Sequence, residues 1–292
     1  MSWNKLSPLA LVAALAFAGA AQAGLVVEAN NPAGDVFAGS GSSGKGQALG
    51  SSGWYYNNAR ANTKIGISGD EPRSGNGSVY FQGQTSGSKA DIEYLVNGAK
   101  PLFSQNYAST GTLGNFSDLS AMSYEWYRDS SSTATGHFHA VMRVLIDRDG
   151  NLNTAGDRGG LVFERIYNAL GVSTDAWVQD SITGTTNVWN FGLGLGTGFD
   201  IDGNGYAYDD TLAAWQAYMP NAKIIGFSAG IGSGWSGSYV GAVDNVSWTI
   251  AGVTSSFNFE LTDSGDVPEP GTLLVAAAGL LGLAATRRRR VR

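Results

Sequence analysis

Short apolar runs separated by polar, turn-forming residues dominate the chain from about Trp54 onward. β-branched and aromatic residues are frequent in these runs, and Gly, Asn, Asp and Ser bound them, a pattern that predicts strands joined by tight turns. In 137–147 both alternating faces are apolar, so this run is expected in the middle of a sheet. The predicted strands are residues 63–68, 78–83, 90–96, 120–128, 137–147, 160–167, 176–180, 186–191, 222–229, 239–250 and 254–260.

One segment, 211–219, has a helical period instead. Leu212, Trp215 and Met219 recur three and four residues apart, the aspartates at 209–210 are N-cap candidates, and a proline follows. No repeat of 20–50 residues is visible, which disfavours a propeller or a solenoid. About eleven short strands and one short helix predict an all-β fold, a two-sheet jelly-roll sandwich.

The N-terminus has the three parts of a secretory signal peptide. Lys5 supplies the positive start, an apolar run covers 9–21, and a small-residue pattern ends at Ala23. We therefore expect signal peptidase to remove residues 1–23 and to leave Gly24 as the mature N-terminus.

The C-terminus has a second three-part pattern. Pro268, Glu269 and Pro270 precede an uncharged apolar run, and an arginine cluster over 287–292 follows it. The run predicts a helix over 272–286, which is short for the ~30 Å hydrocarbon core of a bilayer unless the arginine side chains snorkel. Since clustered arginines stay on the cytoplasmic side, the body of the protein would lie outside.

This tail resembles the PEP-CTERM sorting signal of Gram-negative bacteria, over residues 267–292. The resemblance implies export, brief retention in the inner membrane, cleavage by an exosortase, and release to the cell surface or into exopolysaccharide. It also implies that Pro268, Glu269 and Pro270 are recognised by that enzyme. A plain C-terminal membrane anchor is the alternative. The expected organisation is a signal peptide (1–23), an N-terminal strand with a Gly/Ser-rich loop (24–53), a β-sandwich domain (54–262), and a linker with the sorting signal (263–292).

Composition narrows the classes of function. The 292 residues include no Cys, which excludes disulfides, thiolate zinc sites and a Cys nucleophile. Without Lys5, Glu269 and the five arginines of 287–292, the chain holds 12 basic and 23 acidic residues, a net charge near −11. Such a body would repel phosphates, so nucleic acid is not an expected partner.

A second resemblance lies near the end of the body. Residues 241–246 read Gly-Ala-Val-Asp-Asn-Val, and 257–260 read Phe-Asn-Phe-Glu. With 211–215, 220–227 and 232–235 they are similar in order to the C-terminal half of exported bacterial jelly-roll domains of the concanavalin-like or carbohydrate-binding type. The resemblance implies a fold and no particular activity, because this sandwich hosts lectins, glucanases and inert modules.

Two acidic turns carry candidate calcium ligands. Asp200, Asp202 and Asn204 alternate in a D-x-D-x-N-G pattern, and Ca²⁺ prefers such oxygen ligands. A complete loop would have Glu where Thr211 stands; the neighbouring Asp209 and Asp210 could substitute, and Asp210 is taken as the fourth ligand. The alternative is a polar, glycine-rich hairpin loop.

The second acidic turn contains Asp147, Asp149, Asn151, Asn153 and Asp157. Its glycine is displaced from the calcium-loop position, and two arginines oppose the acidic charge. A solvated turn between two strands is therefore favoured over a calcium site.

Two residue pairs have spacings that suit catalysis or metal binding. His137 and His139, the only histidines, would lie on one face of a strand and could bind zinc or copper with a third ligand. Asp91 and Glu93 would also share a strand face, about 6.5–7 Å apart, near the separation used in glycoside hydrolysis. The favoured alternatives are satisfied histidines and ordinary sheet carboxylates.

Aromatic residues offer a candidate sugar-stacking site. Trp54, Trp126 and Trp235, together with Trp189, could form a flat platform for sugar rings. The alternative is that these rings fill the core.

The leading hypothesis is an exported surface or extracellular-matrix protein, sorted through its tail, non-enzymatic and associated with exopolysaccharide. The alternatives are a carbohydrate-binding module with structural calcium and, third, a glycan-active hydrolase. The expected partners are signal peptidase, an exosortase-type enzyme, the membrane before processing, and surface polysaccharide.

Overall fold

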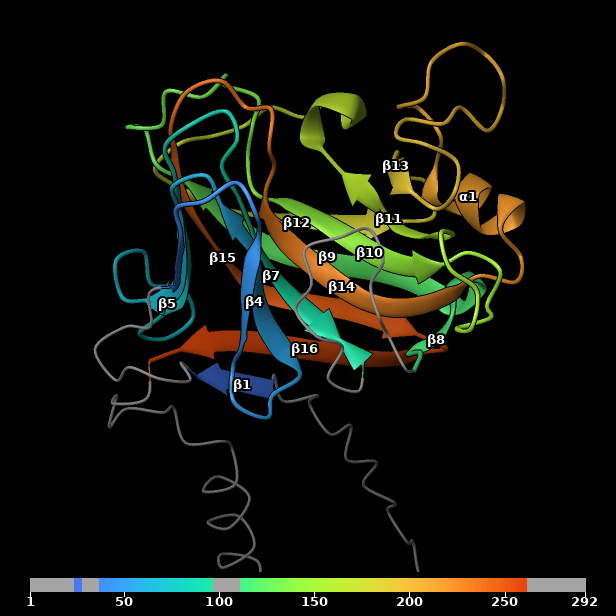
Figure 1. Ribbon diagram of the computed structural model, residues 1–292, viewed down its shortest axis with the longest axis horizontal. Coiled ribbons are helices and arrows are strands. Elements are labelled where there is room, and N and C mark those ends of the chain that lie inside the picture. The colour runs from blue at the N-terminus through green and yellow to red at the C-terminus, as the bar shows by residue number, and fades with distance from the viewer. Residues whose placement is uncertain (1–23, 28–36, 97–110, 262–292) are drawn as a thin grey trace, which may run out of the picture.

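Two sheets lie face to face across an apolar core in the computed structural model, which describes residues 24–27, 37–96 and 111–261 (Figure 1). Sheet A contains β1 (Gly24–Val27), β2 (Phe37–Gly39), β5 (Thr63–Ser68), β6 (Ser78–Gly83), β9 (Leu119–Arg128), β12 (Trp177–Thr183), β15 (Tyr239–Ile250) and β16 (Val253–Glu260). Sheet B contains β3 (Lys45–Ala48), β4 (Trp54–Arg60), β7 (Lys89–Leu95), β8 (Gly114–Asn115), β10 (Val141–Asp147), β11 (Arg158–Phe163), β13 (Trp189–Gly192) and β14 (Lys223–Ile231).

The chain crosses repeatedly from one sheet to the other, which is the connectivity of a jelly roll. Sheet B has the order β13-β11-β10-β14-β7-β4-β3. In sheet A, β15 pairs with β9 along one side and with β6 and then β16 along the other. Strand pairs are antiparallel except β1 with β16. The prediction of an all-β, two-sheet sandwich with a short helix is confirmed.

The core lies between the sheets and is rich in aromatic rings. Trp54 of β4, for example, packs edge-on against Phe259 of β16 with ring centroids 5.0 Å apart. β10 lies between β11 and β14, as its two apolar faces predicted. Its Met142 and Val144 enter the core, whereas Leu145 belongs to a smaller apolar cluster on the outer face of sheet B.

The helix α1 (Leu212–Tyr218) forms where its periodicity predicted it. Its N-cap is Thr211, whose Oγ1 accepts the backbone N–H of Ala214 at 3.2 Å. The expected cap at the aspartates is wrong, because Asp210 accepts the N–H of Ile201 instead.

Several element boundaries differ from the sequence-based ones. The run at 137–147 becomes a strand only from Val141, and 160–167 ends as a strand at Phe163 before a 3₁₀ turn, η3 (Arg165–Asn168). β4 was not predicted, because almost all of its residues are buried and no polar alternation marks it. The Gly/Ser-rich stretch 39–53, expected to be a loop, contains β3.

Both ends of the chain lie outside the described residues, including the predicted signal peptide and the predicted helix at 272–286. Within the described part of the chain, no helix has the length and apolar character needed to cross a membrane.

Candidate functional site

Polar side chains from four strands meet on the outer face of sheet B. Ala90 and Ile92 of β7 enter the core, so the alternating Asp91 and Glu93 point away from it. The strand register pairs Asp91 with Asn57 of β4, Glu93 with Ser228 of β14, and Ser228 in turn with Arg143 of β10. Paired residues project to the same side of a sheet. The sheet-B cluster is defined as Asn57, Asn58, Lys89, Asp91, Glu93, Arg143 and Ser228.

Asp91 is the centre of this cluster. One carboxylate oxygen accepts a hydrogen bond from Nη1 of Arg143 at 2.7 Å. The other lies 3.2 Å from Nζ of Lys89 and accepts a hydrogen bond from Nδ2 of Asn58 at 2.8 Å. Asp91 is 1% exposed, so these contacts form away from bulk water and leave its negative charge well compensated.

Glu93 has a different electrostatic environment from Asp91. Burial, and then the charge of Asp91, raise the pKa of Glu93 to about 7, although Asn57 Nδ2 donates to its carboxylate at 2.5 Å. Burial also acts to raise the pKa of Asp91, but the charges of Lys89 and Arg143 outweigh it and leave that pKa below its ordinary value. Two carboxyls with separated pKa values suit acid–base chemistry. Here both are at most 1% exposed and held by neighbouring side chains, so the cluster is built to balance charge inside the protein.

Partly exposed aromatic rings gather where sheet B ends at β13. Tyr167 of η3 stacks on Tyr208 with centroids 4.4 Å apart, and Trp189 and Tyr206 lie 6.0 and 5.6 Å from the same ring. Tyr206 is 51% exposed. These four residues are the aromatic patch. Flat rings open to solvent on one side suit stacking against sugar rings. Trp189 was among the predicted stacking residues, whereas the tyrosines were not predicted, because they come from a 3₁₀ turn and a loop.

The three other tryptophans proposed to stack on sugars are core residues. Trp54, Trp126 and Trp235 are 1%, 0% and 7% exposed. The Nε1 of Trp126 donates to Oδ2 of Asp180 at 2.7 Å, and Trp235 stacks on Phe138 with centroids 4.8 Å apart. The expectation of a sugar platform is therefore wrong for these three side chains, because they are buried in the core of the sandwich. Strand propensity alone does not predict which aromatic rings are buried there.

The turn at 200–210 brings three of its four predicted calcium ligands together. Asp200, Asp202 and Asp210 each offer a carboxylate oxygen within 4.8 Å of the others. Asn204 instead donates from Nδ2 to Oδ2 of Asp202 at 3.1 Å. Both oxygens of Asp200 accept backbone N–H groups of the two glycines in the turn, at 2.7 and 2.6 Å. The turn is thus stabilised by its own amides, and calcium binding here stays a prediction.

The two histidines do not form a metal pair on a strand. His137 lies in a turn, because β10 starts only at Val141. His139 is 1% exposed, and its Nε2 accepts the backbone N–H of Arg165 at 3.1 Å while Nδ1 lies 2.7 Å from the carbonyl oxygen of Ala140. Burial lowers the pKa of His139 to about 3, so the ring is neutral and donates from Nδ1. It is a satisfied core histidine.

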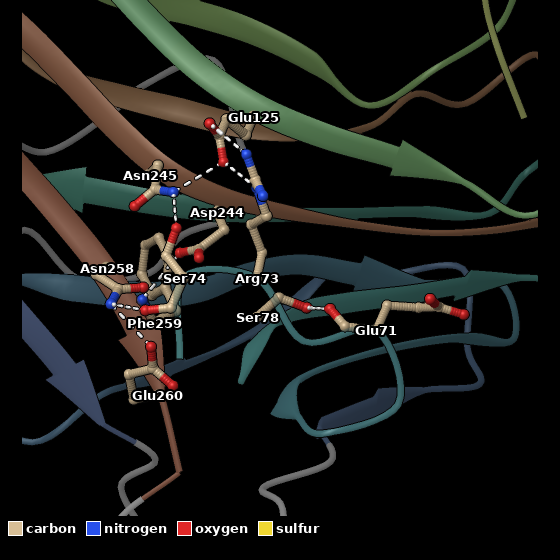
Figure 2. A network of polar contacts seen from close by, with 10 residues as sticks. All are labelled: Glu71, Arg73, Ser74, Ser78, Glu125, Asp244, Asn245, Asn258, Phe259 and Glu260. Carbon is tan, nitrogen blue, oxygen red and sulfur yellow. Dashed lines mark hydrogen bonds and ion pairs between the residues drawn. The ribbon is translucent and has the colours of Figure 1, made fainter. Parts of the chain in front are cut away.

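The two motifs that resemble exported jelly-roll domains meet at one end of sheet A (Figure 2). Asp244 of the first motif accepts the backbone N–H of Phe259 in the second at 3.0 Å. Glu260 accepts the N–H groups of Asn76 and Gly77, in the β5–β6 turn, at 2.5 and 2.7 Å. These bonds join β15 and β16 to a turn distant in sequence, so the motif residues have a structural role.

The same network of polar contacts also includes Glu125 of β9 (Figure 2). Arg73 forms a two-pronged ion pair with Glu125, with Nε and Nη2 2.6 and 3.2 Å from its oxygens. Asn245, at φ 49° where β15 shifts its register on β9, donates to the same carboxylate at 2.8 Å. Asn tolerates this left-handed conformation, which explains its place at the bulge.

Comparison with known proteins identifies the tail. Residues 266–290 match the family model of the PEP-CTERM protein-sorting motif, which confirms the resemblance seen in the sequence. The match implies an exported protein sorted by an exosortase and held transiently by its C-terminus. No curated protein matches the chain.

Two solved structures have a similar body, both from Clostridium thermocellum. One is a family 11 carbohydrate-binding module in complex with a β-1,3-1,4-mixed-linked tetrasaccharide, at 12% identity and a TM-score of 0.36, covering 72% of this chain and 96% of that one. The other is the family 11 carbohydrate-binding module of the cellulosomal cellulase Lic26A-Cel5E, at 13% identity and a TM-score of 0.34, covering 71% and 86%. By its own sheet topology and the matched motif, the chain joins a jelly-roll β-sandwich to a C-terminal PEP-CTERM sorting motif.

Proposed function

We propose that this chain is a non-enzymatic protein of the cell surface or extracellular matrix, associated with exopolysaccharide. Signal peptidase removes residues 1–23, the tail holds the sandwich outside the inner membrane, and an exosortase-type enzyme cuts near Pro268, Glu269 and Pro270. The observation that carries the proposal is the sorting motif at 266–290, placed directly after a folded sandwich.

The chemistry of the tail suits a temporary anchor. Residues 272–286 would span roughly 22 Å as a helix at ~1.5 Å per residue, less than the ~30 Å hydrocarbon core of a bilayer. Arginines of the 287–292 cluster can snorkel to the interface and keep this end cytoplasmic. Pro268 and Pro270 disfavour helix on their N-terminal side and leave an extended backbone for a processing enzyme.

The sheet-B cluster supports a non-catalytic body. Asp91 and Glu93, the carboxylate pair whose spacing along one strand suits a hydrolase, are at most 1% exposed and are bound by side chains of the same cluster. A glycosidase needs both carboxyls beside an open cleft that admits the sugar chain. The cluster therefore fits the role of a buried polar tie between strands.

Deleting residues 267–292 is expected to abolish membrane retention while export through the signal peptide continues. A second variant, with Pro268 and Pro270 changed to Ala, keeps the apolar run and should accumulate uncut in the membrane. Immunoblots of membrane, periplasmic, surface and medium fractions measure both effects. Unchanged retention of the deletion, or normal release of the proline variant, would show that the tail is not a sorting signal.

The aromatic patch favours a second function, carbohydrate binding. Tyr206 and Tyr208 belong to the polar turn at 200–210, and Trp189 and Tyr167 join them in one group of rings. Rings supply stacking surfaces and neighbouring carboxylates and amides supply hydrogen bonds, the combination that sugar sites use. This binding function is compatible with matrix association, and surface polysaccharide is its expected ligand.

The double change Tyr206→Ala and Tyr208→Ala is expected to weaken binding to the cell's own exopolysaccharide at least tenfold, about 1.4 kcal/mol. Affinity electrophoresis with the polysaccharide in the gel measures the retardation. Tyr218→Ala is the matched control, since Tyr218 is 44% exposed but lies on α1. Equal retardation of the patch variant and the control would rule out the patch as the binding surface.

A further inference from the structure

The turn between β10 and β11 gathers three carboxylates at the root of a hairpin. Asp147 ends β10 and pairs in register with Arg158, which begins β11. Asp149 and Asp157 lie in the turn, and Gly150 adopts φ 75°, which lets the chain reverse. One carboxylate oxygen from each aspartate lies within 4.8 Å of the other two. The hairpin therefore forces three like charges into one small volume.

Two of these carboxylates are buried and incompletely satisfied. Asp147 is fully buried and Asp157 is 7% exposed. Oδ2 of Asp147 accepts from Nε of Arg158 at 2.9 Å, and Oδ2 of Asp157 accepts the backbone N–H of Asp149 at 3.1 Å. Their Oδ1 atoms are buried and have no hydrogen-bond partner among the residues that the structure describes. A buried carboxylate oxygen without a hydrogen-bond donor or a cation lowers the stability of the folded state.

Most of the negative charge in the turn has no ion-pair partner. Of its two arginines, only Arg158 forms an ion pair with one of the three carboxylates, and Asp149 and Asp157 have none among the residues that the structure describes. Asp149 is held over the buried pair because its oxygens accept the N–H of Asn151 at 2.7 Å and the hydroxyl of Thr154 at 2.9 Å. The donors are all oxygens, which suit a hard cation. Two oxygens bound to one Ca²⁺ can be at most about 4.6–5.2 Å apart, twice the usual Ca–O distance, so three oxygens within 4.8 Å of one another can share one ion.

We infer that the β10–β11 turn is a Ca²⁺ site formed by Asp147, Asp149 and Asp157. The inference rests on buried carboxylate oxygens without a hydrogen-bond partner. None of the three carboxylates in the turn at 200–210 has such an oxygen. The site fixes the turn of this sheet-B hairpin, where Leu152 packs on the outer apolar cluster. Its affinity is expected in the range of extracellular calcium modules, on the order of 10⁻⁴–10⁻³ M.

The test is a calcium titration of the full chain in mild detergent, stripped with EDTA and followed by thermal unfolding and equilibrium dialysis. At 10 mM Ca²⁺ we expect the unfolding temperature to rise by about 3–10 °C and one ion to be bound at this turn. Asp157→Asn should weaken this calcium response at least tenfold. Without calcium, the same variant should unfold at or above the wild-type temperature, because Asn still accepts the N–H of Asp149 and removes one repelling charge.

Asp202→Asn, in the other acidic turn, is the matched control and should keep the response. Asp149→Asn gives an independent measurement if Asp157→Asn does not fold, because Asp149 is exposed. Absence of a calcium response in the wild type overturns the inference, as does an undiminished response in the variants of this turn. Loss of the response in Asp202→Asn alone would place the ion at 200–210 and also overturns it.

Discussion

Replacing Arg143 with Met is expected to lower the free energy of unfolding by about 3–5 kcal/mol. Arg143 is 5% exposed and donates to Asp91 at 2.7 Å, so its loss leaves a buried carboxylate with an incomplete set of partners. Removing one partner of a buried ion pair costs this much because the remaining charge stays in a medium of low polarity. Urea-induced unfolding of the wild type and the variant measures the difference.

Arg73→Met is the matched control for this prediction. Its ion pair with Glu125 is as short, at 2.6 Å, but the Arg73 side chain is 43% exposed. Solvent screens such a pair, so the loss should be about 1 kcal/mol or less. Adding Asp91→Asn to Arg143→Met should recover part of the stability, since the unbalanced charge is then removed. Equal costs for the two arginine changes would show that the sheet-B cluster contributes no more than a surface pair.

The second large effect concerns pH and the network in Figure 2. Burial raises the pKa of Asp244 to about 8, and hydrogen bonds from the backbone of Phe259 and Asn245 only partly oppose this. The native state therefore keeps a proton that the unfolded chain loses near pH 4. Stability should fall as pH rises from about 4 to about 8, and the loss is complete above pH 8. At about 1.4 kcal/mol per pKa unit, even two units correspond to about 3 kcal/mol.

Asp244→Asn is expected to remove this part of the pH dependence. Asn keeps the oxygen that accepts the N–H of Phe259 and carries no charge at any pH. Urea unfolding at pH 5 and at pH 8 should show a smaller loss of stability on raising the pH in the variant than in the wild type. Asp209→Asn, at an exposed position, removes the same formal charge and should leave the wild-type slope. Parallel slopes for wild type and Asp244→Asn would mean that Asp244 is ionised in the folded protein.

Local pattern was enough to predict most of the fold. β5 and β6 begin and end where alternation and turn residues placed them. Hydrophobic periodicity did not predict strands that the rest of the fold buries on both faces. β4 is the example, since its aromatic and polar residues are almost all buried. The same limit explains the tryptophans, since sequence cannot tell a ring at the surface from a ring between two sheets.

The candidate sites depend on contacts between residues that are far apart in the sequence. The shared face of Asp91 and Glu93 follows from their spacing, but their partners Asn58 and Arg143 are 33 and 52 residues away from Asp91. The inference of a calcium site in the β10–β11 turn rests on a feature that local sequence does not show. The calcium-loop pattern is more complete at 200–210, whereas burial of Asp147 and Asp157 arises from the sandwich around them.

The intact mass of the protein recovered from the cell surface or medium shows whether the tail sorts an exported sandwich. We expect a chain that begins at Gly24 and ends near Pro268–Pro270, without the apolar run and the arginines. A full-length chain in the cytosol, with residues 1–23 and 271–292 still attached, would contradict this expectation.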